Sequence, residues 1–224
     1  MRVGFVVAME DEYTPFLSSL GRFVKDETVC GMVFSIYKSS DMSEVVLARC
    51  GIGCVASSAA TALLIGRFNC DFIVNFGLVG SLKEFTLGTL VIVKDVFHYD
   101  ADLTPFGAPL ATPADFQSPY FSSDAGYFAR LVADGHSFGR LASGDKFIAN
   151  KKTKDWLVSD FDADICDMEG AGIAITCARA HVPFIMLKMV SDGAEEGAAQ
   201  TFEESKGKSF DFAVSVVLSV LADA

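Results

Sequence analysis

Three of the apolar segments in this chain are each followed by acidic side chains, and carboxyl groups can act as general acids and bases. Glu12 ends an acidic run that begins at residue 10, Glu169 follows a later segment, and Asp192 follows the last one. Two carboxyl groups in different surroundings can hold opposite protonation states, so that one donates a proton while the other accepts one. A fourth apolar segment is followed by the glycine-rich residues 77–81. These four places together form the candidate site.

Each of these features also has a purely structural interpretation. Acidic residues in the first turn of a helix, such as residues 10–12, complement the helix dipole. Glu169 or Asp192 could cap the helix that follows it. Gly77 and Gly80 could serve a tight turn, since their spacing matches neither a P-loop nor a GxGxxG fingerprint. The features therefore indicate a site only when they are taken together.

Short apolar runs alternate with helical patterns along the chain, which is typical of an α/β protein. Strands are expected over residues 3–9, 32–38, 44–50, 71–76, 89–93, 164–168 and 184–190, and helices over 10–20, 53–68, 124–133, 151–161, 170–180 and 206–222. The polar residues 39–41 are expected to join the second and third of these strands as a turn. The alternation favours a largely parallel or mixed sheet with helices on both faces and ligands beyond the carboxyl ends of its strands.

The composition favours a folded protein without nucleic-acid or membrane partners. Of the 224 residues 51% are hydrophobic, which suffices for a large core, and the formal net charge is −11. Such a chain lacks the clustered Lys and Arg that bind phosphate backbones. The longest uncharged run, residues 51–66, is too short for a membrane span, and the acidic residues 10–12 do not fit a signal peptide. We therefore expect a cytoplasmic protein.

The six cysteines and three histidines are scattered along the chain. The cysteines include no CxxC pair, and none of the histidines has metal-ligand spacing to a cysteine. Reduced cysteines packed in a core are the expected arrangement. The sequence predicts no disulfide framework and no metal site.

Taken in order, these segments resemble the nucleoside phosphorylase/hydrolase superfamily, and most of all its 5′-methylthioadenosine/S-adenosylhomocysteine nucleosidases. The resemblance covers nearly the whole chain, and its landmarks are residues 8–12, 50–53, 75–80, 100–107, 143–148, 167–169 and 190–192, together with Phe202. It implies a single domain, residues 1–224, with a three-layer α/β/α architecture, a twisted mixed central sheet and usually a homodimeric assembly. It also implies hydrolysis of the N-glycosidic bond of a purine nucleoside, with no cofactor.

The resemblance implies a role for each acidic group. Asp192 resembles the general acid that donates a hydrogen bond or a proton to N7 of the departing base. Glu12 resembles the general base that activates the attacking water, and the two carboxyl groups therefore need opposite protonation states. Glu169 resembles the carboxylate that binds the ribose hydroxyls, and Met168 would pack under the sugar.

Further substrate contacts are carried over from the same resemblance. Phe147 and Phe202 would flank the base, whose edge the backbone of Ile148 would read. Leu103 and Phe106 match positions that cross to the partner subunit and line the pocket for a 5′-alkylthio group. The remaining expected contacts are Ile52, Leu78, Val79, Gly80, Lys188 and Ser191.

Two positions depart from the family pattern. The family usually carries a small hydroxyl residue at the position of Leu78, where it helps to hold water near the anomeric carbon. It usually carries an arginine at the position of Lys188, and lysine keeps the charge but loses the planar bidentate fork. Both departures concern the nucleophile, so the position of the water and the 5′ substituent stay open. The candidate substrates are methylthioadenosine, S-adenosylhomocysteine, 5′-deoxyadenosine and adenosine, and a 6-oxopurine nucleoside is a further alternative.

Two other functions of the same fold stay open. A phosphorylase would need cations for phosphate, and Arg49 and Lys188 offer some charge, although the acidic residues 10–12 would repel a dianion. A non-catalytic nucleoside-binding protein could tolerate the departures described above. Retention of both Glu12 and Asp192 favours an enzyme over such a binder.

Overall fold

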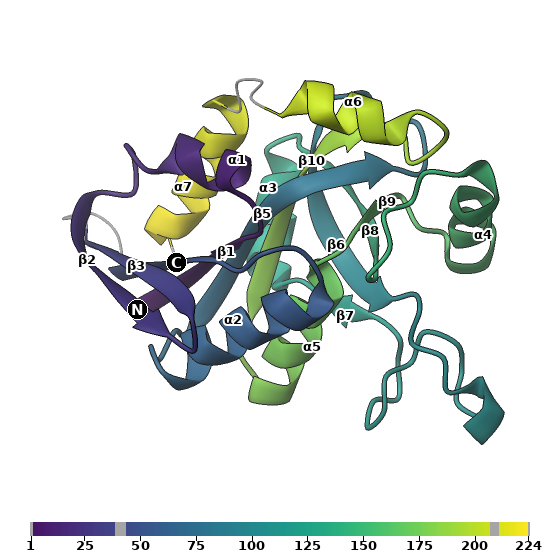
Figure 1. The fold of residues 1–224 in the computed structure, drawn as a ribbon, viewed down its shortest axis with the longest axis horizontal. Coiled ribbons are helices and arrows are strands. Elements are labelled where there is room, and N and C mark those ends of the chain that lie inside the picture. The colour runs from purple at the N-terminus through teal and green to yellow at the C-terminus, as the bar shows by residue number, and fades with distance from the viewer. Residues whose placement is uncertain (1, 39–43, 207–210, 224) are drawn as a thin grey trace.

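In the ten-stranded central sheet five strands close into a ring, four more extend the sheet from one side, and a short tenth strand pairs with the ring (Figure 1). This computed structural model describes residues 2–38, 44–206 and 211–223. Its strands are β1 (Arg2–Val7), β2 (Arg22–Val29), β3 (Met32–Lys38), β4 (Glu44–Arg49), β5 (Phe72–Ser81), β6 (Leu90–His98), β7 (Phe121–Ser122), β8 (Ser137–Ser143), β9 (Ile165–Asp167) and β10 (Phe184–Asp192). Its helices are α1 (Glu10–Tyr13), η1 (Thr14–Phe16), α2 (Cys54–Gly66), η2 (Thr104–Phe106), α3 (Ala125–Ala133), α4 (Lys151–Phe161), α5 (Gly170–Ala180), α6 (Ala198–Ser205) and α7 (Asp211–Asp223).

The closed part of the sheet brings together strands that are distant in sequence. Strand β10 pairs in parallel with β5 and antiparallel with β6. Strands β6, β8 and β9 follow in parallel, and β9 returns antiparallel to β5. In the resulting register Asp192 stands beside Gly80, and Gly80 stands beside Cys166. The ends of β5, β9 and β10 therefore meet at one place.

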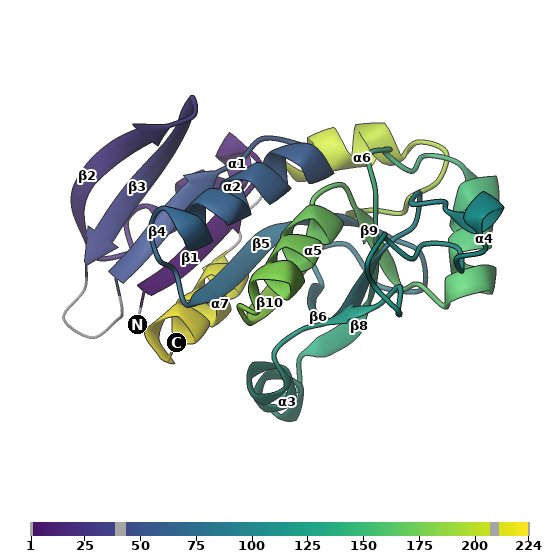
Figure 2. The same ribbon diagram turned by 90° about the horizontal axis from the view of Figure 1, so that it is seen from below.

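Helices cover both faces of the sheet, which confirms the predicted three-layer α/β/α class. One apolar cluster joins alternate β1 residues such as Phe5 to Phe16 of η1, Leu131 of α3 and Val217 of α7. A second cluster covers the opposite face with residues of α2 and α5, and Figures 1 and 2 show these two helices side by side. Strands buried on both faces are apolar at nearly every position, which is why β1, β5 and β10 are visible in the sequence.

Two expected elements differ from the structure. The helix predicted over residues 10–20 is only α1 followed by the single 3₁₀ turn η1, which contains Pro15. A proline inside a helix removes a hydrogen-bond donor and ends the regular pattern. The glycine-rich residues 77–81 do not form a turn but continue β5 to Ser81, because their backbone pairs with β10 and β9.

Besides the short β7 and η2, which were not predicted, three longer elements lack a clear signal in the sequence. Strand β2 pairs only with β3 at the edge of the sheet and is largely exposed, so its residues show no apolar alternation. Strand β8 has the mixed sequence SFGRLAS, and α6 is a polar helix. The helix predicted over residues 206–222 corresponds to α7 from residue 211 onward, while the expected turn at residues 39–41 lies outside the described residues.

Within the described ranges, none of the helices has both the length and the apolar character that crossing a bilayer requires.

The close approach of α2 and α5 depends on Gly172. A Cβ atom at this position would stand 2.2 Å from the carbonyl oxygen of Cys54 and 2.5 Å from Oγ of Ser57. We predict that Gly172→Ala lowers the free energy of unfolding by about 1–3 kcal/mol, because backbone atoms must move to admit the methyl group. Urea titration of both proteins measures the difference.

Gly66 in α2 is the matched control, since a Cβ atom there would meet no heavy atom within 4 Å. Gly66→Ala should leave stability unchanged or raise it by about 0.4–1 kcal/mol through the lower entropy of the unfolded chain. Equal destabilisation by the two substitutions would contradict the packing argument.

Candidate active site

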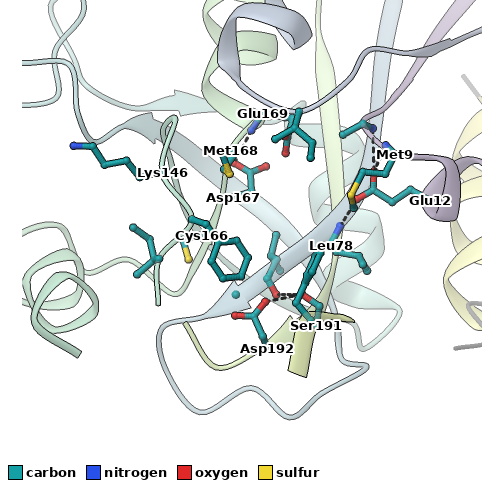
Figure 3. A pocket seen from close by; sticks show the side chains of 17 residues that line it. Met9, Glu12, Leu78, Lys146, Cys166, Asp167, Met168, Glu169, Ser191 and Asp192 are labelled. Carbon is teal, nitrogen blue, oxygen red and sulfur yellow. Dashed lines mark hydrogen bonds between the residues drawn. The ribbon is translucent and has the colours of Figure 1, made fainter. Parts of the chain in front are cut away.

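A pocket opens where β5, β9 and β10 end (Figure 3). Eight segments contribute to its wall: the turn after β1, α1, the turn before α2, β5, the β8–α4 loop, the β9–α5 segment, β10 and α6. The lining residues are Ala8, Met9, Glu12, Ile52, Leu78, Val79, Gly80, Lys146, Phe147, Ile148, Cys166, Asp167, Met168, Glu169, Ser191, Asp192 and Phe202. The closed sheet thus gathers side chains that span most of the sequence into one cavity.

Most of the residues that sequence analysis singled out line this cavity. The structure brings together Glu12, Ile52, Leu78, Val79, Gly80, Phe147, Ile148, Met168, Glu169, Ser191, Asp192 and Phe202. Three expected residues lie elsewhere. Lys188 is fully buried behind the wall, where its ammonium pairs with Asp167. Leu103 directly precedes η2 and Phe106 is its last residue. Neither lines the cavity, and Phe106 is 87% exposed.

Five lining residues were not given a role from the sequence. Ala8, Met9 and Asp167 belong to segments that carried the resemblance, so their positions were available although their contacts were not. Lys146 lies between Asp145 and Phe147 in a further segment of this kind. Cys166 had no signal in the sequence, because only its register with β5 brings it to the site.

The carboxylate of Glu12 is held by three backbone N–H groups. Oε2 accepts hydrogen bonds from the N–H of Ala8 (2.9 Å) and of Met9 (3.0 Å), and Oε1 accepts one from the N–H of Leu78 (2.8 Å). Burial raises the pKa of Glu12 above its usual value, while these N–H donors and the ammonium of Lys188 oppose the rise. Fixed donors of this kind favour the ionised form of a buried carboxyl group. These donors fix the orientation of the Glu12 carboxyl group, while burial keeps its net pKa above the usual value.

The carboxyl group of Glu169 joins two helix ends. Its Oε1 accepts a hydrogen bond of 2.9 Å from the N–H of Gly53, directly before α2. Glu169 occupies the N-cap position of α5, yet its side chain caps no N–H of that helix. Burial, and then the charge of Asp167, raise the pKa of Glu169 to about 7. Its ionisation is thus balanced near neutral pH.

Asp192 stands in the last pair of β10 with β5, opposite Glu12 and Glu169 in the pocket (Figure 3). Its Oδ1 accepts from the N–H of Ala194 (2.9 Å), and its Oδ2 accepts from the hydroxyl of Ser191 (2.8 Å). Burial raises the pKa of Asp192 above its usual value. A buried carboxyl group with a raised pKa can retain its proton and donate it to a ligand.

Glycines in β5 give these side chains their space. A Cβ atom on Gly80 would stand 3.0 Å from Oδ1 of Asp192 and 3.1 Å from Sγ of Cys166. A Cβ atom on Gly77 would stand 3.1 Å from Nζ of Lys188 and 3.2 Å from Oε1 of Glu12. The two glycines are therefore explained by crowding around the site, not by a turn.

Aromatic side chains form the mouth of the pocket. The rings of Phe147 and Phe202 lie edge to face with their centroids 5.7 Å apart. Phe147 is 44% exposed and Ile52 is 60% exposed, whereas Ile148 is buried. Apolar walls with a few convergent polar groups are typical of small-molecule sites. A planar ring is a suitable ligand for such walls.

Neither a thiolate nor a metal ion is indicated as the reactive group. Burial raises the pKa of Cys50 and Cys54 to about 12 and that of Cys166 still further, and a neutral thiol is a poor nucleophile. Among the residues that the structure describes, no group of three or more His, Cys, Asp or Glu side chains could hold a metal ion. The chemistry available here is proton transfer between carboxyl groups and a bound ligand.

Comparison with known proteins gives matches over nearly the whole chain. Residues 2–222 match the family model of the phosphorylase superfamily. The aminodeoxyfutalosine nucleosidase of Helicobacter pylori J99 is 32% identical over 93% of each chain. The 5′-methylthioadenosine/S-adenosylhomocysteine nucleosidase of Shewanella loihica is 30% identical over 99% of each chain.

A solved structure supports the same relationship. A mutant of the Helicobacter pylori 5′-methylthioadenosine/S-adenosylhomocysteine nucleosidase, with 5′-methylthioadenosine in its active site, superposes with a TM-score of 0.92 at 28% identity. The alignment covers all of this chain and 99% of the other.

The burial of the thiols leads to a direct chemical prediction. Cys30 is exposed and the other five cysteines are buried. We predict that one thiol per chain reacts rapidly with a disulfide reagent such as DTNB in the native protein, and that Cys30→Ser abolishes this fast phase. Cys70→Ser is the matched control and should retain it, while unfolding in urea should release all buried thiols. Rapid modification of Cys54 or Cys166 would contradict the inferred environment of the pocket.

Proposed function

The chain belongs to the phosphorylase superfamily, and we propose that it hydrolyses the N-glycosidic bond of adenine nucleosides and releases adenine. The observation that carries this proposal is the pair of buried carboxyl groups in one pocket. Burial raises the pKa of both groups. At Glu12 three N–H donors and the ammonium of Lys188 oppose the rise in pKa, and at Asp192 one N–H, the hydroxyl of Ser191 and the charge of Lys154 do so. An acid and a base on opposite sides of a ligand are what glycosidic hydrolysis requires.

Asp192 assists the departure of the base in this mechanism. The purine accumulates negative charge as the bond to ribose lengthens, and a proton or hydrogen bond at N7 offsets it. Asp192 lies beside Ser191, whose hydroxyl group donates to Oδ2 and so orients the carboxyl group. Phe147 and Phe202 are well placed to enclose the adenine ring, and the backbone at Ile148 is well placed to read its edge.

Glu12 activates the attacking water, and Glu169 binds the ribose hydroxyls. With three acceptor positions of Glu12 already used by N–H groups, one lone-pair direction of its carboxylate is left for a water molecule. The N–H of Leu78 is one of these donors, so this contribution of position 78 does not depend on its side chain. The lack of a hydroxyl side chain at position 78 therefore does not displace the general base Glu12.

Electrostatics favour water over phosphate as the nucleophile. Glu12, Asp167 and Glu169 all line the pocket, and Lys188 is already paired with Asp167 at 2.7 Å. A phosphate dianion would meet two further carboxylates, and among the described residues that line the pocket the exposed Lys146 is the one cation. Phosphorolysis is thus the alternative that these contacts disfavour.

We propose a homodimer in which Leu103 and Phe106 of one subunit complete the 5′ side of the pocket of the other. Phe106 is 87% exposed, and large exposed apolar side chains at the tip of a loop often mark an interface. The exposed side chain of Ile52 lies at the pocket mouth, where it would be an apolar neighbour for Phe106 of the other subunit.

We also propose a cytoplasmic location. Its support is the presence of six free cysteines, since reduced thiols persist in reducing compartments.

Hydrolysis is tested by measuring release of adenine from methylthioadenosine, S-adenosylhomocysteine, aminodeoxyfutalosine, 5′-deoxyadenosine and adenosine, and of hypoxanthine from inosine, with and without phosphate. We expect adenine release without phosphate, lowered about 10²–10⁴-fold by Glu12→Gln and by Asp192→Asn because each removes a proton-transfer group. Glu10→Gln is the matched control for the first substitution, since Glu10 is exposed, and it should retain activity.

Release that requires phosphate would replace the proposal with phosphorolysis. Binding of adenosine derivatives without release of any base would identify a non-catalytic nucleoside-binding protein.

The homodimer is tested by light scattering coupled to size-exclusion chromatography. We predict that Phe106→Asp converts dimers to monomers and raises KM for 5′-alkylthio substrates more than for adenosine. Phe138, which is 51% exposed on β8, provides the control Phe138→Asp with no effect on assembly. A wild-type monomer would exclude the shared pocket.

A further inference from the structure

A buried ion pair lies beside Glu169, with Asp167 in the lining of the pocket and Lys188 behind it. Nζ of Lys188 is 2.7 Å from Oδ2 of Asp167, and both side chains are only 1% exposed. Replacing both partners of such a pair with well-packed apolar residues is often neutral or stabilising, because burying two charges is costly. An ion pair kept at this place therefore calls for an explanation other than stability alone.

Asp167 is bound to the backbone that carries Glu169. Its two carboxylate oxygens both accept from the N–H of Gly170, each at 3.1 Å, and Oδ1 also accepts from the N–H of Glu169 at 3.3 Å. Asp167 thus caps the first turn of α5, and it holds the backbone of Glu169 in place.

Lys188 in turn lies next to the proposed general base. Nζ of Lys188 and Oε1 of Glu12 both lie against Gly77. A Cβ atom on Gly77 would be 3.1 Å from the first and 3.2 Å from the second. The pair therefore connects the segment of Glu169 to the surroundings of Glu12 across β5.

The charges around Glu169 are unbalanced. It is faced by Asp167 on β9, by Lys188 on β10, by Glu12 on α1 and by the buried thiol of Cys50 after β4. Asp145 and Cys54 approach the same end of α2, where Oδ1 of Asp145 accepts from the N–H of Cys54 at 2.7 Å. Both thiols are neutral, because burial raises their pKa values to about 12. Lys188 is thus the one cation among these groups.

We propose that Asp167 is a positioning residue that, together with Lys188, sets the orientation and the ionisation of Glu169. This rests on the proposed function, in which the ionised carboxylate of Glu169 accepts hydrogen bonds from the ribose hydroxyls. Asp167 acts through its hydrogen bonds to the α5 backbone and through its charge, while Lys188 supplies the opposing charge.

The two members of the pair act on Glu169 in opposite directions. The charge of Asp167 raises the pKa of Glu169 and the charge of Lys188 lowers it, with burial the largest cause of the overall rise to about 7. Glu169 is therefore protonated as the pH falls below about 7, and it then loses acceptor capacity for the ribose. Substrate binding should weaken below that pH.

The test is a carboxyl ¹³C NMR titration of protein labelled at Glu Cδ, with the Glu169 resonance assigned by its loss in Glu169→Gln. We expect Asp167→Asn to lower the midpoint of Glu169 by about 1 pH unit or more, and Lys188→Met to raise it by a similar amount. The double variant should titrate close to the wild type. A purely structural role would disturb the fold without moving the midpoints in opposite directions.

A midpoint that Asp167→Asn leaves unchanged or raises would overturn the proposal. If this variant does not fold, comparison of the double variant with Lys188→Met isolates the same charge, since a neutral buried pair is often tolerated. The midpoint should then be lower in the double variant, and equal midpoints would contradict the proposal.

Kinetics provide a second readout. KM for the nucleoside should rise below about pH 7 in the wild type, and Asp167→Asn should extend the range of low KM to lower pH. A wild type that releases no base would refute the proposed function, whereas the NMR titration would still decide the role of Asp167.

Discussion

The architecture of this protein depends on keeping several buried carboxyl groups together around one pocket. Burying an isolated ionised carboxylate is costly, and proteins offset the cost with hydrogen bonds and opposite charges. Here backbone N–H groups supply most of the compensation: Glu12 takes three, Asp167 takes those at the start of α5, and Glu169 takes one before α2. These donors come from strand ends and helix starts, so the site can exist only where the closed sheet brings such ends together.

The same requirement explains the glycines of β5. Strand residues normally place a side chain on each face of the sheet in turn, and side chains at positions 77 and 80 would occupy the space of Lys188, Glu12 and Asp192. Extending β5 through these glycines lets its backbone pair with β10 and β9 while the carboxyl groups pack against it. The strand is therefore both the scaffold and part of the wall of the pocket.

Sequence reasoning succeeded where apolar periodicity and chemistry coincide. The strands buried on both faces, the helices α2, α4 and α5, and most of the cavity lining could be predicted, because each depends on a local run or on a motif. The exposed edge strand β2 could not, since edge position is decided by tertiary pairing. Cys166 and the Lys188–Asp167 pair could not either, because register across the closed sheet brings them to the site.

The two departures from the family pattern acquire a physical meaning in this setting. Leu78 was expected to weaken the hold on the nucleophilic water, yet its backbone N–H still binds Glu12, so the change affects the lining of the pocket and not the placement of the base. Lys188 forms a single contact with Asp167 at 2.7 Å, where the fork of an arginine could reach two acceptors. A compact ammonium fits between Gly77 and Asp167, and its one charge is shared among three carboxylates. Both departures therefore preserve the electrostatic arrangement of the site: the Leu78 side chain changes only the lining of the pocket, and Lys188 keeps its charge behind the wall.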